Sequence, residues 1–200
     1  MGHSAQQCRA VVKSRKIYYI CPKIKIAMDD TAKHWYALRV TYARELKVKS
    51  FFDDIDVESF IPMQCIELPA AGRRKRKAIV PAVHNLIFVN IETERLKQIK
   101  RHTSLPICYI MNPTDKRPVI IDDRSMQDFI AISRSQLRGL EWIECTPAEL
   151  ASGDRVEIVD GAFSGVRGIM LHRNGRGRFV VSIEVAAVAV SLPAKYLKKV

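Results

Sequence analysis

The sequence of 200 residues predicts an α+β fold, in which one sheet with helices packed on it is followed by a very small β-barrel. Strand and helix patterns alternate between residues 34 and 136 without the regular spacing of a doubly wound parallel sheet. From Gly153 to Glu184, glycines at 161, 165 and 168 punctuate an alternating apolar pattern, as expected for a tightly turned barrel. Because such a barrel leaves almost no room for an active site, the search for function turns to binding.

The organised part of the chain is expected to begin at residue 34. In residues 1–33 the apolar residues show no regular period, so this segment is treated as an N-terminal extension and left out of the fold prediction. Aromatic and β-branched residues at 34–40 predict a strand. Apolar residues then recur at helical spacing across 43–54, which predicts an amphipathic helix.

Two further strands are predicted at 57–68 and 78–91, on either side of a basic run. Pro62 places the first at an edge or a bulge, because proline has no N–H to donate to a neighbouring strand. The run from Arg73 to Lys77 consists of adjacent cations, which must lie where solvent or phosphate can screen them. We therefore expect this run to be a loop between the two strands.

The rest of the first domain is predicted to alternate helices with short strands. Apolar residues at helical spacing indicate helices at 93–102 and 123–136. Short strands are expected at 105–110 and 119–121, with Asn112-Pro113 as a turn between them. The economical architecture is one sheet with these helices packed on it.

The last part of the chain is predicted to contain several short strands joined by tight turns. Positive φ is expected at Gly161 and Gly165, and Gly168 is expected to let the chain bend closely as residues 166–171 form the next strand. Asn174-Gly175 between two apolar runs is the strongest short hairpin signal that a sequence can carry.

The charge of the chain, +12 overall, is spread unevenly. Lys and Arg outnumber Asp and Glu by 7 to 2 in residues 1–33, by 18 to 12 in 34–140 and by 8 to 7 in 141–200. The change in charge and pattern predicts a domain at 34–140, a linker at 141–151 and the barrel at 152–200. The basic excess favours a polyanionic partner, because cations displace condensed counterions from phosphates. Solubility alone is the alternative explanation.

Several classes of protein are excluded by composition. The longest apolar runs, such as 80–83 and 185–190, fall far short of the roughly 20 residues that span a bilayer. The N-terminus lacks the apolar core and cleavage site of a secretory signal, so we expect a cytoplasmic protein with no membrane partner. The five cysteines are odd in number and widely spaced, which favours reduced structural thiols over disulfides or zinc ligands.

Catalytic residues, cofactors and metals are not expected. The five histidines form no H-E-x-x-H pattern. The pair Asp53-Asp54 is explained by the end of a helix and the pair Asp122-Asp123 by the start of one, so neither pair needs a catalytic role. Gly175-Arg176-Gly177 is a lone G-x-G that no lysine, serine or helix follows, unlike a phosphate-binding loop.

The pattern G-D-R-V-x-I-V-D-G-x-F-x-G-x-x-G, from Gly153 to Gly168, resembles the KOW motif of NusG-type transcription elongation factors. Upstream, Trp35-Tyr36 at the start of a strand, the following helix, the basic hairpin and Asn-Leu-Ile-Phe-Val at 85–89 resemble the NusG N-terminal domain. The resemblance covers residues 34–200. It implies an N-terminal antiparallel sheet with packed helices, followed by an SH3-like β-barrel.

One departure from the family pattern points to a specialised member. The Pro-Gly-Tyr that usually precedes the Val-Phe-Val strand is here His84-Asn85-Leu86. This is similar to the specialised paralogues, RfaH and especially the UpxY antiterminators of Bacteroidetes capsular polysaccharide operons. The resemblance thus implies an operon-specific antitermination and elongation factor that suppresses pausing or termination.

The resemblance also implies partners and contact residues. Such proteins lie on RNA polymerase across the DNA cleft, and holding its two sides together disfavours the opened, paused state. The positions that it places at the polymerase are Arg39, Tyr42, Leu86, Phe88 and, on the opposite side of the cleft, Lys97 in the segment 97–103. For Leu86 and Phe88, ordinary sheet core is the alternative, because one face of a strand must be buried.

Nucleic acid and a further protein are the other implied partners. Arg73, Arg74, Lys75, Arg76 and Lys77 are candidates for contact with upstream or non-template DNA, with a solvated hairpin tip as the alternative. Phe163 and Ile169 fall where relatives bind a ribosomal protein or a termination factor, although Phe163 could equally close the end of the barrel. A monomer is expected.

A second hypothesis is a ribosome-associated or RNA-binding KOW protein, in which the barrel and the basic loop grip structured RNA. It predicts RNA binding in the absence of polymerase, steeply weakened by salt.

Overall fold

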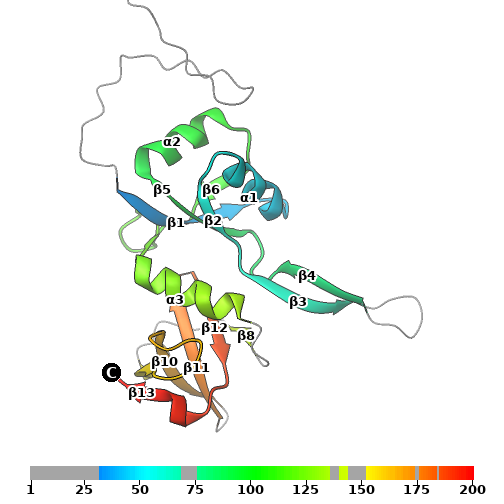
Figure 1. Cartoon of the computed structure of the whole chain (residues 1–200). Helices are drawn as coiled ribbons and strands as arrows, with labels where there is room; N and C mark the ends of the chain where they lie inside the picture. The colour runs from blue at the N-terminus through cyan, green and yellow to red at the C-terminus, as the bar shows by residue number, and fades with distance from the viewer. Residues whose placement is uncertain (1–31, 69–75, 136–139, 144–151, 174–175, 184) are drawn as a thin grey trace, which may run out of the picture. The chain divides into compact units, whose positions relative to one another are not determined.

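The computed structural model describes residues 32–68, 76–135, 140–143, 152–173, 176–183 and 185–200. In chain order the elements are β1 (Lys33–Val40), α1 (Glu45–Asp54), β2 (Glu58–Phe60), β3 (Met63–Leu68), β4 (Arg76–Pro81), β5 (Leu86–Glu92), α2 (Thr93–His102), β6 (Ile107–Tyr109), β7 (Ile120–Ile121), α3 (Asp123–Arg134), β8 (Glu141–Ile143), β9 (Asp154–Ile158), β10 (Arg167–Arg173), β11 (Arg176–Ile183), β12 (Ala186–Val190), a 3-10 turn (Ala194–Tyr196) and β13 (Leu197–Lys199). The predicted α+β class is confirmed, because an antiparallel sheet with helices precedes a second antiparallel sheet (Figure 1).

The N-terminal sheet has the order β2-β5-β1-β6, with β7 paired to β1. Side chains alternate between its two faces, so each strand contributes to two hydrophobic clusters. On one face, Leu38 and Ile87 pack with Val48 and Phe52 of α1 and with Leu96 of α2. The other face packs against α3.

Helix α3 connects the core of the N-terminal sheet with that of the C-terminal sheet. The helix begins at Asp123, and the carboxylate of the preceding residue, Asp122, accepts the Ser125 N–H at 3.1 Å and so caps it. The ring of Phe129 lies 5.9 Å from Phe88 of the N-terminal sheet and 5.9 Å from Trp142 of β8, measured between centroids. A single hydrophobic cluster therefore includes residues of both sheets.

The expected single strands at 57–68 and 78–91 are each two strands, which corrects the sequence prediction. Pro62 stands between β2 and β3, which belong to different sheets, and as a proline it has no N–H with which to extend a strand ladder. The second region is interrupted between β4 and β5, where Asn85 takes a left-handed conformation with φ of 61°. The basic run was expected to be a loop, but Arg76 and Lys77 lie in β4.

Strands β3 and β4 form a two-stranded sheet, which we call the ribbon (Figure 1). Its register pairs Met63 with Pro81 at the base and Leu68 with Arg76 at the far end. The Ala82 N–H donates to the Pro62 carbonyl at 2.8 Å and closes the base. Residues 69–75, including Arg73, Arg74 and Lys75, lie outside the described residues.

The C-terminal sheet has the order β13-β9-β10-β11-β12-β8, and the predicted small β domain is confirmed. Gly161 and Gly165 have φ of 86° and 91°, as their turn positions predicted. The pairing of Arg173 with Arg176 leaves two residues for the predicted hairpin turn, and these two lie outside the described residues. Strand β8 lies within the predicted linker 141–151, and it pairs with β12.

Candidate functional site

The turn between β1 and α1 holds Tyr42 in solvent. Tyr42 is 81% exposed, and both it and Ala43 have positive φ, 63° and 49°. Left-handed conformations cost non-glycine residues about 1 kcal/mol or more each, so surrounding bonds must hold the turn. The guanidinium of Arg44 lies 5.7 Å from the Tyr42 ring centroid, within range of a cation–π contact.

The buried carboxylate of Glu45, just after this turn, binds the backbone of a distant segment. Glu45, only 2% exposed, accepts the Asn85 N–H at 2.5 Å, and the carbonyl of Asn85 in turn accepts the Val40 N–H at 2.9 Å. Glu45 lies in the first turn of α1, where the helix dipole favours a negative charge. The sequence reasoning missed Glu45, because its partner is a backbone group forty residues away along the chain.

The predicted polymerase residues on the sheet divide into exposed and buried ones. Arg39 is exposed near the end of β1, and it pairs with Leu86 on one side and with Cys108 on the other. Leu86 is 3% and Phe88 0% exposed, and Phe88 stacks on Phe60 with 6.4 Å between ring centroids. Leu86 and Phe88 are thus buried in the core of the sheet, as the alternative to a polymerase contact predicted.

Lys97 lies on α2, on the rim of a cavity of about 490 Å³. Its ammonium forms an ion pair with Glu94 at 2.6 Å. Tyr36 and Tyr109 also line this cavity, and burial, together with the nearby Tyr36 and Glu94, raises the pKa of Tyr109. The Lys100 ammonium lies 3.8 Å from the centroid of the Tyr109 ring. The last turn of α2 is basic, with Lys100, Arg101 and His102.

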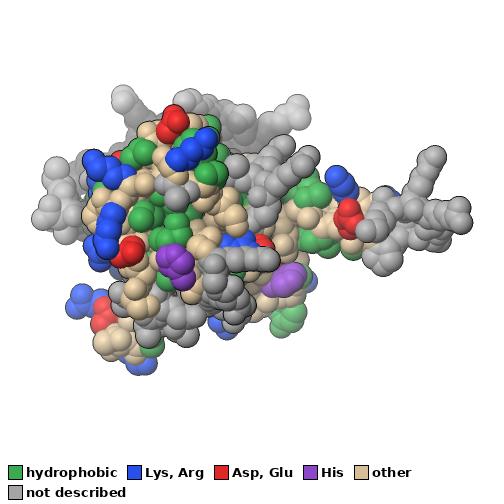
Figure 2. Space-filling view, turned by 90° about the horizontal axis from the view of Figure 1, so that it is seen from below, with side chains coloured by type: hydrophobic (Ala, Val, Ile, Leu, Met, Phe, Trp, Pro, Cys, Tyr) green, Lys and Arg blue, Asp and Glu red, His purple; other side chains and the backbone are tan. Residues whose placement is uncertain are grey.

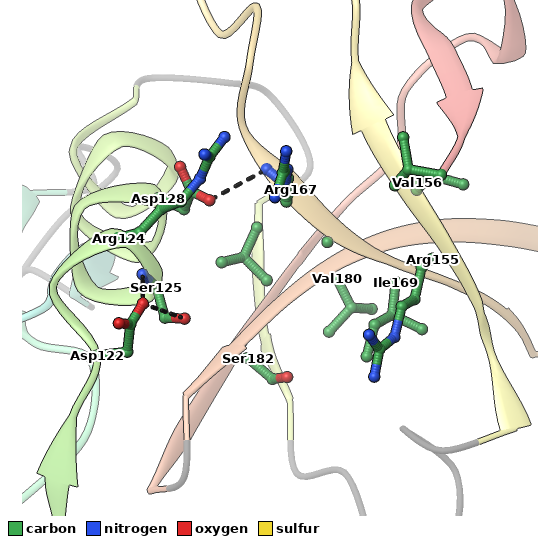
Figure 3. A pocket seen from close by; sticks show the side chains of 13 residues that line it. Asp122, Arg124, Ser125, Asp128, Arg155, Val156, Arg167, Ile169, Val180 and Ser182 are labelled. Atoms are coloured by element: carbon green, nitrogen blue, oxygen red, sulfur yellow. Dashed lines mark hydrogen bonds between the residues drawn. The ribbon is translucent and has the colours of Figure 1, made fainter.

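The two candidate contact residues of the C-terminal sheet are both half-buried. Phe163 packs against the large hydrophobic cluster, and Ile169 packs against a smaller one on that sheet. Ile169 also lines a cavity of about 580 Å³ between α3 and strands β9 to β11 (Figure 3). Phe163 does not line this cavity.

The cavity beside α3 combines an apolar floor with charged walls. Figure 3 shows Asp128 of α3 facing Arg167 of β10, whose backbone N–H donates to the carboxylate at 3.2 Å. Burial raises the pKa of Asp128, although that hydrogen bond and the Arg124 and Arg167 guanidinium groups act in the opposite direction. Sequence reasoning missed Asp128, Arg124 and Arg155, which no local motif marks.

The described residues were compared with the requirements of a metal site and of a membrane span. Across the residues that the structure describes, no group of three His, Cys, Asp or Glu side chains is placed to hold a metal ion. In the same residues, no helix combines the length and apolarity needed to cross a membrane. The surfaces that stand out are the Tyr42 turn, the basic end of α2 and the ribbon.

Comparisons with known proteins add one family match. Residues 33–130 match the family model described as NusG, transcription termination factor nusG. The match runs from β1 into α3, so the similarity to this family lies in the N-terminal sheet and its helices. No curated protein sequence matches the chain. Among solved structures, one described as "Domain interaction in Thermotoga maritima NusG" is similar over 84% of this chain and 97% of that chain, with 18% identity and a TM-score of 0.43.

Proposed function

We propose that this chain, whose residues 33–130 match the NusG family model, is a transcription elongation and antitermination factor that binds RNA polymerase. The family match carries the proposal. The protein acts by binding, with no catalytic residue or cofactor of its own, and it works in the cytoplasm as a monomer on the polymerase.

The Tyr42 turn is the centre of the proposed polymerase surface. Tyrosine in a held conformation loses little entropy on binding, and tyrosine and arginine are enriched among the residues that dominate interface energies. Tyr42 meets this description, and Arg39 is exposed on the adjoining strand. Leu86 and Phe88 enter the proposal only as the buried support of this surface.

Lys97 and the basic end of α2 are proposed to contact the opposite side of the polymerase cleft. Binding to both sides favours the closed cleft over the opened, paused one, because a ligand shifts an equilibrium by its differential affinity for the two states. The positive charge of the last turn of α2 supports this assignment.

The basic run Arg73 to Lys77 is proposed to contact upstream or non-template DNA. Arg76 and Lys77, the two members that the structure describes, are both exposed. Phe163 and Ile169 are proposed to bind a ribosomal protein or a termination factor. Both are half-buried, so such a partner would contact only their exposed parts.

We further propose that the factor is operon-specific and acts at polysaccharide biosynthesis operons. The replacement of Pro-Gly-Tyr by His84-Asn85-Leu86 supports this. Asn85 occupies the glycine position of that pattern with φ of 61°, and asparagine is among the residues that best tolerate this conformation. The substitution therefore keeps the turn while changing the side chains on either side of it.

The test is retention of the full-length chain on immobilised RNA polymerase. Tyr42→Ala is expected to weaken binding about tenfold or more, because it removes an exposed aromatic anchor. Val159→Ala, which trims an exposed side chain of the C-terminal half, is the matched control and should bind like the wild type. In a single-round transcription assay, the wild type should shorten pauses and Tyr42→Ala should do so less.

Two results would decide against the proposal. Failure of the wild-type chain to bind polymerase would remove its basis. Binding to structured RNA without polymerase, with strong salt dependence, would favour the ribosome-associated alternative, which the net charge of +12 also allows.

A further inference from the structure

We propose that the polymerase segment that docks at the start of α1 is acidic and carries an apolar side chain among its carboxylates. The surface that receives it, which we call the α1 surface, consists of Tyr42, Arg44, Leu46 and Lys47, all exposed. This inference rests on the proposed function. It adds the chemistry of the partner segment and three contact residues, Arg44, Leu46 and Lys47.

Two large apolar side chains of the α1 surface face solvent. Tyr42, in the turn before α1, is 81% exposed, and Leu46, in the first turn of the helix, is 57% exposed. Val48 and Phe52 of α1 are fully buried in the core, so the helix cannot rotate to cover Leu46 without exposing them. Single exposed apolar residues are common on proteins, but neighbouring ones are typical of an interaction site.

The charge of the α1 surface is positive and is not offset by its own residues. In the part of the chain that the structure describes, neither Arg44 nor Lys47 forms an ion pair. Between residues 39 and 50 the only carboxylate is that of Glu45, which is buried and bound to a backbone N–H. The exposed carboxylates of α1, Asp53 and Asp54, lie at its opposite end.

The segments beside the α1 surface add no negative charge. The Val40 N–H donates to the Asn85 carbonyl at 2.9 Å and the Thr41 N–H to the Pro106 carbonyl at 3.1 Å, so two other segments adjoin the Tyr42 turn. Neither 82–88 nor 103–108 contains an aspartate or a glutamate. An acidic partner can therefore approach the two cations without repulsion from these segments.

The ribbon differs from the α1 surface in this respect. It is the arm on the right of Figure 2, where acidic, basic and hydrophobic side chains lie next to one another. Its register places Glu67 directly opposite Lys77, so these two charges offset each other. The α1 surface combines exposed apolar side chains with positive charge, and charge complementarity thus points to an acidic partner.

Leu46 favours a protein segment over nucleic acid as that partner. Proteins that bind single strands stack successive bases on aromatic rings, and the α1 surface has one ring, that of Tyr42. An aliphatic side chain gains from burial against apolar groups, which phosphates do not offer. In protein interfaces, by contrast, tyrosine and arginine anchors are surrounded by contacts that exclude water. Binding of single-stranded DNA is an outcome that the test distinguishes.

The test measures association and dissociation rates of the full-length chain on immobilised RNA polymerase free of nucleic acid. Leu46→Ala should raise the dissociation rate about tenfold at every salt concentration, because burial of the leucine is lost. Lys47→Glu should lower the association rate about tenfold at low salt, since it repels an acidic segment. That effect should largely vanish at about 1 M salt, where charges are screened beyond about 3 Å.

Three variants control this comparison. Lys47→Arg keeps the charge and should bind like the wild type. Lys198→Glu reverses an exposed lysine of β13, and Val159→Ala trims an exposed apolar side chain of the C-terminal half, so both should leave the two rates unchanged. A labelled single-stranded oligothymidine is the second probe. Lys47→Glu should weaken its binding no more than Lys198→Glu does, because both change the net charge equally.

Wild-type rates for Leu46→Ala would overturn the inference, as would an effect of Lys47→Glu that salt does not reduce. Weaker binding of Lys47→Glu to oligothymidine than of Lys198→Glu, with polymerase binding unchanged, would assign the surface to single-stranded DNA instead. In each of these outcomes the wild type still binds polymerase, so the proposed function stands. Failure of the wild type to bind polymerase would overturn both.

Discussion

At the residue scale, positive φ and a buried charge concentrate at the Tyr42 turn. Of the five non-glycine residues with positive φ in the described chain, Asn85 and Asp56 are of types that tolerate it, whereas Tyr42 and Ala43 are not. Glu45 and its bond to Asn85 fix the start of α1 against the turn before β5. Strain that neighbouring contacts maintain is frequent at binding sites, which agrees with the proposed role of this turn.

Asp128 gives a prediction about pH. Its pKa is raised in the folded chain, chiefly by burial, so the folded state holds this proton more tightly than the unfolded state does. The stability that this group contributes is therefore fully present below its unfolded pKa and is lost as pH rises through the folded pKa. Asp128→Asn does not titrate, and its amide oxygen can still accept the Arg167 N–H.

The free energy of unfolding of Asp128→Asn, relative to the wild type, is therefore expected to increase as pH rises through the unfolded and then the folded pKa. Urea titrations at a series of pH values measure this difference. A difference that stays constant with pH, or decreases, would contradict the assigned direction.

At the scale of elements, strands β10 and β11 of the C-terminal sheet approach closely at Gly168. A Cβ added to Gly168 of β10 would lie 2.6 Å from the Val180 carbonyl oxygen and 2.7 Å from the Phe179 ring. Backbone and a fully buried ring cannot move aside, so only glycine fits. At Gly177 of β11 the nearest atom would be the Met170 sulfur at 3.3 Å, at the end of a flexible side chain.

We therefore expect Gly168→Ala to lower the free energy of unfolding by about 1–3 kcal/mol, as overpacking does in other cores. Gly177→Ala is the matched control and should change stability little, because the methionine can shift. Chemical denaturation of both variants measures the effect. Equal stability of Gly168→Ala and the wild type would show that the two strands can separate at this point without cost.

At the scale of the whole molecule, the continuity of the core stands out. Phe129 of α3 contacts Phe60 and Phe88 of the N-terminal sheet and Trp142 of the C-terminal sheet. The predicted domain boundary at 141–151 remains a prediction, although β8 at its start is part of the C-terminal sheet. The shared cluster suggests that the two sheets unfold together.

Phe129→Ala tests this coupling. It is expected to lower the free energy of unfolding by about 3–5 kcal/mol, because a fully buried ring is lost. Trp35, buried in the N-terminal sheet, and Trp142, in β8, report on the two sheets when the other tryptophan is replaced by phenylalanine. In Phe129→Ala, the urea midpoint of unfolding reported by each tryptophan's fluorescence should fall by a similar amount. A shift confined to one tryptophan would indicate that the sheets unfold independently.

Much of the fold was predictable from local patterns. The helix at 93–102 has the predicted bounds, since its apolar spacing and flanking residues mark both ends. The regions 57–68 and 78–91 were predicted as single strands because apolar content does not separate one long strand from two short ones. The breaks at Pro62 and Asn85 depend on which strands the segments join, and that is a matter of pairing over long sequence distances.

The candidate site was predictable only in part, for a related reason. The charges of the ribbon follow from residue types within a few positions, whereas Tyr42 was named only through the family resemblance, and its exposure is a finding of the structure. The burial of Leu86 and Phe88, the support from Glu45 and the cavity beside Asp128 arise from segments distant in the sequence. Periodicity, turn chemistry and charge act over a few residues, and so they can be deduced from the chain alone. Burial and hydrogen-bond partners are set by contacts between distant segments, and these exist only once the sheets and α3 have packed.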